Sequence, residues 1–214
     1  MAFDELKLGT RDLHRRVEQA VGIESVCADL PAYRHLLSQL LGYYEPLEER
    51  LSRFAWDSAG LDFAARRKST WLREDLVFLG VDQRQQAALP RCRQLPQPRS
   101  IAAALGAMYV LEGATLGGQV ILRMIARNPQ LATAGGTGFQ AHFHAGYGPH
   151  NNSMWLSFKA AATRELDSSA RIADAVHGAR ETFLTYESWL HSATQPLPCE
   201  LLAHHEPQHE APSA

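Results

Sequence analysis

One histidine near the start of the chain lies among charged residues of both signs. At about 100° per residue of a helix, His14 falls at the edge of an apolar stripe, and within roughly 60° of it lie Lys7, Arg11 and Glu18. An imidazole can ligate a metal, an apolar stripe can cover a flat ring, and cations can pair with carboxylates on that ring. Glu18, one turn further on, can orient the imidazole. A half-buried histidine among solvated charges would give the same pattern, so this helix alone does not decide.

The apolar stretch 101–127 contains four glycines, at Gly106, Gly113, Gly117 and Gly118. At about 1 kcal/mol each relative to alanine, they forgo roughly 4 kcal/mol of helix propensity. Three of them, Gly106, Gly113 and Gly117, fall within about 40° on the helical wheel. This stripe without side chains suits the close approach of a flat ligand, and it equally suits packing against a neighbouring helix.

Helical spacing dominates the rest of the chain, and strand signals are nearly absent. Helices are expected at about 3–20, 31–55, 60–79, 83–89, 99–127, 152–164 and 168–191. Pro31 suits the first turn of one helix, and Asn128-Pro129 closes the glycine-containing one. The fold class predicted is all-α, a single-domain helical bundle over residues 1–192 with a flexible C-terminal tail over 193–214.

Two segments are expected to be irregular. Residues 90–100 are typical of a connector, and residues 134–152 of a loop rich in glycine and histidine. The histidines of this loop and of the tail are scattered through polar sequence, and we assign them no metal site: His142, His144, His150, His204, His205 and His209.

Composition excludes several classes of protein. The net charge of −2 provides no basic field for nucleic acid or an anionic membrane surface. The three cysteines, Cys27, Cys92 and Cys199, form no CxxC pair, and no apolar run reaches the roughly 18 residues that span a bilayer. We therefore expect a cytoplasmic protein without nucleic-acid or membrane partners.

Two sequence motifs resemble those of a known family. LKLGTRDLHRRVE, residues 6–18, and YVLEGATLGGQV, residues 109–120, are similar to the proximal and distal helix motifs of haem oxygenases. YGPHNNSMWLSFK, residues 147–159, and ARETFLTYESWL, residues 179–190, also resemble this family. The bacterial, biliverdin-producing members that supply bilin to bacteriophytochromes are the nearest in character.

The resemblance implies a role for each candidate site residue. His14 would be the proximal iron ligand, and the distal surface over the haem would comprise Gly113, Gly117 and Gly118. Candidate partners for the haem propionates are Lys7, Arg11 and Lys159, and Phe183 would line the distal pocket wall. Haem b, iron protoporphyrin IX, would be both cofactor and substrate. A distal wall without side chains leaves room for bound oxygen and directs it toward the edge of the ring.

The activity implied is oxidative cleavage of haem with O2 and electrons to biliverdin, CO and Fe2+. A reductase, a ferredoxin or ascorbate would donate the electrons, and a bacteriophytochrome is a candidate acceptor of the bilin. Animal-type members carry an aspartate where this chain has Ala114, and a propionate-binding tyrosine where it has Met108. Neighbouring Tyr109 points elsewhere on an ideal helix.

Two rival functions stay open at this point. The loss of the aspartate at Ala114 favours a haem carrier or storage protein with the same fold and little turnover. A thiaminase-like hydrolase on a similar scaffold would need a catalytic cysteine, and none of the three cysteines has a suitable context.

Overall fold

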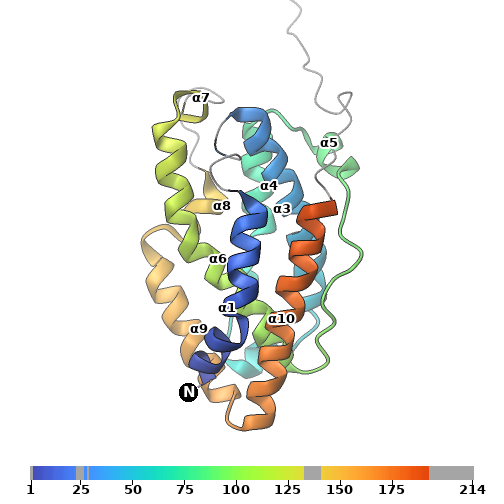
Figure 1. Ribbon diagram of the computed structural model, residues 1–214, viewed down its shortest axis with the longest axis vertical. Coiled ribbons are helices and arrows are strands. Elements are labelled where there is room, and N and C mark those ends of the chain that lie inside the picture. The colour runs from blue at the N-terminus through green and yellow to red at the C-terminus, as the bar shows by residue number, and fades with distance from the viewer. Residues whose placement is uncertain (1, 23–26, 28, 133–140, 193–214) are drawn as a thin grey trace, which may run out of the picture.

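The computed structural model describes residues 2–22, 27, 29–132 and 141–192 as a bundle of helices, without a strand in those ranges (Figure 1). The tail predicted at 193–214 and the first part of the glycine-rich loop lie outside the described residues. The α-helices are α1 (Ala2–Val21), α3 (Leu30–Leu51), α4 (Ser69–Phe78), α5 (Gln83–Ala88), α6 (Ile101–Arg127), α7 (Pro129–Ala132), α8 (His142–Ala145), α9 (Asn151–Glu165) and α10 (Ser169–Ser192). Short 3-10 turns lie at Trp56–Ala59, Ala64–Arg66 and Gly148–His150. The predicted all-α fold is confirmed.

The glycine-containing helix α6 is the centre of the bundle, and its most extensive contacts are with α10. A Cβ atom on Gly106 would overlap the carbonyl oxygen of Ala175, and one on Gly178 would overlap that of Ala103. The two backbones therefore touch, which only glycine allows. For Gly106, helix packing is thus the correct interpretation of the bare stripe, and a ligand surface is not.

By length and composition α6 could cross a membrane, but 67% of its most apolar window is buried inside the bundle. The core helix of a globular protein meets the same criteria. Burial against α10 accounts for its apolar sequence.

Several helix ends follow from local sequence. The Asp29 carboxylate accepts a hydrogen bond from the Ala32 amide, and Pro31 lies in the first turn of α3. Ser100 caps α6 in the same way, and Asn128 ends that helix as expected. The connector at 90–100 contains no helix of its own before the first turn of α6.

Other boundaries were predicted wrongly, because contacts distant in sequence set them. Of the helix expected at 60–79, only α4 is regular, since Gly60 adopts a left-handed φ of 70° and buried Glu48 accepts the backbone N–H groups of Lys68 and Ser69. The helix expected at 31–55 ends at Leu51.

The loop expected at 134–152 contains the short helix α8. This helix begins where the backbone N–H groups of His142 and Phe143 donate to the buried carboxylate of Asp75. Asp75 thereby caps α8 across a large sequence separation. Burial raises the pKa of this carboxyl group, although the Phe143 and His142 amides act in the opposite direction.

Candidate functional site

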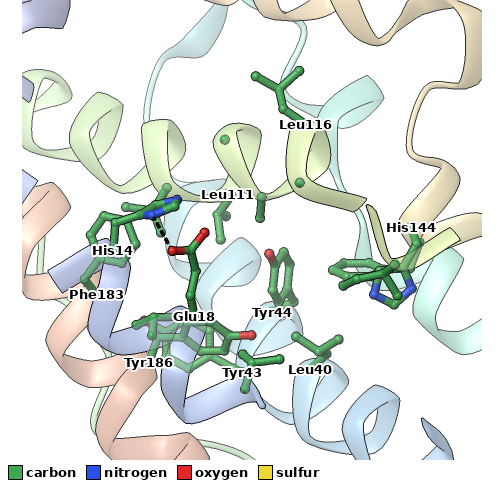
Figure 2. A pocket seen from close by; sticks show the side chains of 18 of the residues that line it. His14, Glu18, Leu40, Tyr43, Tyr44, Leu111, Leu116, His144, Phe183 and Tyr186 are labelled. Atoms are coloured by element: carbon green, nitrogen blue, oxygen red, sulfur yellow. Dashed lines mark ion pairs between the residues drawn. The ribbon is translucent and has the colours of Figure 1, made fainter. Parts of the chain in front are cut away.

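A cavity of about 530 Å3 lies where α1, α3, α6, α8, α9 and α10 converge (Figure 2). Its wall is mostly apolar, with side chains that include Val17, Leu36, Leu40, Leu111, Ile121 and Phe183. A concave, apolar site with few polar groups is typical of small-molecule and cofactor binding. Residues from both resembled motifs, on α1 and on α6, face this one cavity.

His14 and Glu18 lie together on the α1 side of the cavity. The His14 Nδ1 atom is 3.4 Å from Glu18 Oε2, and the imidazole side chain is 57% exposed. The carboxylate therefore lies beside Nδ1, and the other ring nitrogen is left for a ligand in the cavity. The arrangement is the one expected from the sequence.

Phe183 lines the cavity from α10, but it lies beside the histidine. Its ring meets the His14 ring edge-on, with centroids 5.8 Å apart and planes at 76°. Phe183 thus lines the cavity as expected and also packs against the imidazole, and its place on the distal wall stays a prediction.

The glycines of α6 divide into two groups. Gly113 and Gly117 line the cavity, and a Cβ atom on either would have no heavy atom within 4 Å. Gly118 does not line it, because a Cβ atom there would overlap the carbonyl oxygen of His144. Of the glycines expected on the distal surface, Gly118 instead allows α8 to approach α6.

The three cations expected to meet propionates lie outside the cavity wall. Lys7 and Arg11 are exposed on α1, two turns and one turn before His14. Lys159, on α9, holds its ammonium group 5.3 Å from the centre of the Phe3 ring. Lys7 and Arg11 thus share a helix face with the histidine, whereas Lys159 comes from a different element.

Tyr109 and His144 are cavity residues that the sequence did not identify. Tyr109 packs against Trp155 with centroids 6.0 Å apart, and burial raises the pKa of its hydroxyl. The expectation that it points elsewhere is wrong, because Tyr109, four residues before Gly113, lies on the same face of α6 as that cavity-lining glycine.

His144 is 2% exposed, and its Nδ1 atom is 2.9 Å from the Tyr33 hydroxyl oxygen. Burial lowers the pKa of the imidazole to about 3, so the ring is uncharged at neutral pH. His14 and His144 lie at opposite ends of the view in Figure 2. No periodicity in the sequence predicts that His144 lines the cavity. It does so because its backbone packs directly on α6 at Gly118.

The donor set suits one iron-bearing planar ligand. Within the described ranges no three His, Cys, Asp or Glu side chains gather into a metal-ion site. His14, beside an apolar slot bordered by the bare backbone of Gly113 and Gly117, fits a haem, whose ring supplies further iron ligands. His144 also lines this cavity, but its Nδ1 atom is engaged with the Tyr33 hydroxyl. The geometry therefore suits a helical haem-binding protein with His14 as the ligand candidate.

Comparison with known proteins identifies the family. A family model described as "Heme oxygenase" matches residues 2–192. A protein named "Heme oxygenase" from Xanthomonas campestris pv. campestris (strain 8004) is 34% identical over 179 residues, covering 83% of this chain and 99% of that protein. The chain therefore belongs to the haem oxygenase family, and the activity expected from the motifs, oxidative cleavage of haem, is the activity of this family.

A solved structure agrees with the fold. The NO- and CO-bound haem oxygenase from Neisseria meningitidis superposes with a TM-score of 0.72 at 19% sequence identity, and the match covers 90% of this chain and 92% of that one. At this identity the likeness concerns the arrangement of helices alone.

Proposed function

We propose that the chain holds haem b through His14 and cleaves it with O2 and electrons to biliverdin, CO and ferrous iron. The observation that carries this proposal is that His14 and the bare surface at Gly113 and Gly117 face one apolar cavity. Among the residues that the structure describes, Ala114 alone favours the carrier alternative, and family membership favours turnover.

His14 acts as the proximal ligand in this proposal, with its orientation set by two neighbours. Glu18, 3.4 Å from Nδ1, orients the ring so that Nε2 carries the lone pair for iron, and the Phe183 ring packs edge-on against the imidazole. Both neighbours act on the same side chain, so the ligand is partly preorganised before haem binds.

The surface at Gly113 and Gly117 acts as the distal wall. Bound haem supplies the oxygen chemistry at its own iron, and the protein contributes position and electrostatics. Ala114 lines the cavity but offers no proton-bearing group, so we assign proton delivery to water that backbone carbonyls of the distal helix would hold. Uncharged His144, hydrogen-bonded to Tyr33, is a polar group at the edge of the same space.

The propionate contacts are proposed from charge, and the electron donor and the bilin acceptor are proposed from the family. Lys7, Arg11 and Lys159 meet the propionates at the solvent edge, once haem draws α1 and α9 toward its carboxylates. A cytoplasmic reductase, a ferredoxin or ascorbate donates electrons, and a bacteriophytochrome accepts the bilin. The haem oxygenase domain comprises residues 1–192, a boundary that agrees with the end of the family match.

The test is an absorption titration with haemin, followed by ascorbate in air. We expect one haem to bind per chain and to give the Soret band of a histidine-ligated complex. After ascorbate is added, this band should decay while biliverdin absorption appears and iron is released. His14→Ala should lose this band and most turnover, with partial recovery on adding imidazole, whereas His177→Ala, an exposed histidine outside the cavity, should behave as wild type. A band that persists under ascorbate would instead support the carrier.

A further inference from the structure

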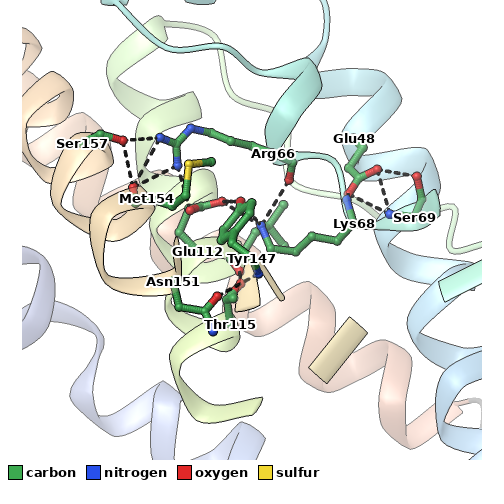
Figure 3. Close-up of polar contacts among 11 residues, drawn as sticks. Glu48, Arg66, Lys68, Ser69, Glu112, Thr115, Tyr147, Asn151, Met154 and Ser157 are labelled. Carbon is green, nitrogen blue, oxygen red and sulfur yellow. Dashed lines mark hydrogen bonds and ion pairs between the residues drawn. The ribbon is translucent and has the colours of Figure 1, made fainter. Parts of the chain in front are cut away.

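Glu112 is a buried carboxylate directly before the first distal glycine, and no role has yet been assigned to it. It is 2% exposed and does not line the cavity. Its oxygens accept hydrogen bonds from Arg66 Nη1 at 2.8 Å, Lys68 Nζ at 2.7 Å and the Tyr147 hydroxyl at 2.7 Å (Figure 3). Two cations and a phenol therefore meet one carboxylate on the side of α6 away from the cavity.

The donors to Glu112 are themselves fixed to other elements. Arg66 also donates to the Met154 carbonyl at 3.3 Å and to Ser157 Oγ at 2.7 Å, both on α9. Lys68 donates to the Arg66 carbonyl at 3.2 Å and lies 5.3 Å from the centre of the Tyr147 ring. The carboxylate thus ties α6 to the segment 66–68, to α9 and to the segment after α8.

The segment 66–68 is held independently from its other side. Glu48, on α3 and 1% exposed, accepts the backbone N–H of Lys68 at 2.6 Å and that of Ser69 at 3.2 Å. The segment 66–68 therefore donates hydrogen bonds to two buried carboxylates, Glu48 on α3 and Glu112 on α6. Glu112 connects it to the helix that carries the distal surface.

A buried ion pair is an inefficient way to stabilise a fold, because desolvation offsets most of the attraction. Its particular strength is that charge-assisted hydrogen bonds fix geometry. This property is needed on α6, because Gly113 and Gly117 contribute no side-chain packing on their own face and weaken the helix there. Thr115, on the same side as Glu112, adds a close contact with Gly146.

We propose that Glu112 is a positioning residue: with Arg66, Lys68 and Tyr147 it fixes the height and register of the Gly113–Gly117 surface over the haem. The inference rests on the proposed function, in which that surface is the distal wall. Glu112 acts through the backbone of α6 and touches neither haem nor a ligand on it.

The test compares the isosteric variants Glu112→Gln and Glu48→Gln, two carboxylates of equal burial that hold the same segment. The probe is the infrared C–O stretching band of CO bound to the ferrous haem complex, which reports the distal environment independently of turnover. We expect Glu112→Gln to bind haemin with the wild-type Soret band, to shift or split the C–O band, and to slow biliverdin formation about tenfold, less than the roughly hundredfold loss that a 1 Å misplacement can produce. Glu48→Gln should lower the melting temperature but keep the wild-type C–O band.

Tyr147→Phe is the alternative where Glu112→Gln does not fold. It removes the hydrogen bond that Tyr147 donates to Glu112 and the one it accepts from Lys68, and it leaves both ion pairs of Glu112 intact. It should shift the C–O band in the same direction by a smaller amount. An unchanged C–O band in a folded Glu112→Gln or Tyr147→Phe variant, or an equal shift in Glu48→Gln, would overturn the inference. If wild type itself forms no histidine-ligated haem complex, the proposed function has failed instead.

Discussion

The carbonyl oxygen of His144 occupies the space that a side chain on Gly118 would need. Because of this contact, α8 lies directly on α6, and the His144 ring reaches the cavity that Gly113 and Gly117 border. The glycines of this motif therefore have different roles. Gly113 and Gly117 leave space for a ligand, and Gly118 allows the backbones of α6 and α8 to meet.

Gly118→Ala should therefore destabilise the protein without haem. The added methyl group must displace α8 or bend α6, at a cost of about 1–3 kcal/mol, the usual range for overpacking. Thermal or urea unfolding of the haem-free protein measures this loss. An unchanged melting temperature would show that α8 moves aside freely.

Gly113→Ala and Gly117→Ala should have the opposite effect on stability. Their Cβ atoms meet nothing within 4 Å, so each should stabilise the haem-free protein by up to about 1 kcal/mol through helix propensity. The same methyl groups would stand on the proposed distal surface, so biliverdin formation should fall. Full activity in both variants would remove these glycines from the site.

Glu18→Gln should weaken haemin binding by about tenfold, because the amide orients the imidazole but raises its basicity less than the carboxylate does. Because the side chains of His14 and Glu18 are both partly exposed, the expected loss lies at the lower end of the roughly 10- to 100-fold range typical of residues that orient a metal ligand. Glu187→Gln is the control, since Glu187, on α10, pairs with Arg16 of α1 outside the cavity. Haemin titration followed in the Soret region distinguishes the two.

Lys7→Met and Arg11→Met should each weaken haemin binding by no more than about fivefold, since exposed ion pairs contribute roughly 0–1 kcal/mol. The loss should shrink as salt screens the charges. Arg84→Met, an exposed cation on α5 outside the cavity, should have no effect. An equal loss in all three variants would indicate a general electrostatic effect and no propionate contact.

His144 should make the stability of the haem-free protein depend on pH. Its pKa is about 3 in the fold, below its ordinary value of 6.5, so the unfolded chain binds the additional proton between these values. Its stabilising contribution is complete above about pH 6.5 and declines by about 1.4 kcal/mol per pH unit as the pH falls toward 3. The free energy of unfolding of wild type minus that of His144→Gln should show this slope. The control His177→Gln, at an exposed histidine, should keep the pH dependence of wild type. If His144→Gln keeps the same pH dependence as wild type, the lowered pKa of His144 is not its cause.

The sequence predicted the features that depend on local pattern. Helical periodicity placed α1, α6 and α10, and the wheel brought His14 and Glu18 together, because both are properties of one helix. The position of α8 depends on Asp75, which lies 67 residues before His142, so no local pattern reveals it.

The burial of Glu112 had one sequence signal, an acidic residue inside an apolar helix. Its partners could not be predicted, because Arg66 and Lys68 reach it only through the irregular segment that was expected to be helical. Similarly, Gly106 and Gly117 share a stripe on the wheel, and only the position of α10 separates the packed glycine from the open one.

The glycine contacts between α6 and α10 also determine which wall of the cavity can adapt. At Gly106 and Gly178 backbone meets backbone, with no side chain between the helices that could change rotamer. α1 meets α10 through flexible side chains, among them the pair of Arg16 with Glu187. We therefore expect that, when substrate enters or product leaves, the helix that bears His14 adjusts while the glycine surface of α6 keeps its position.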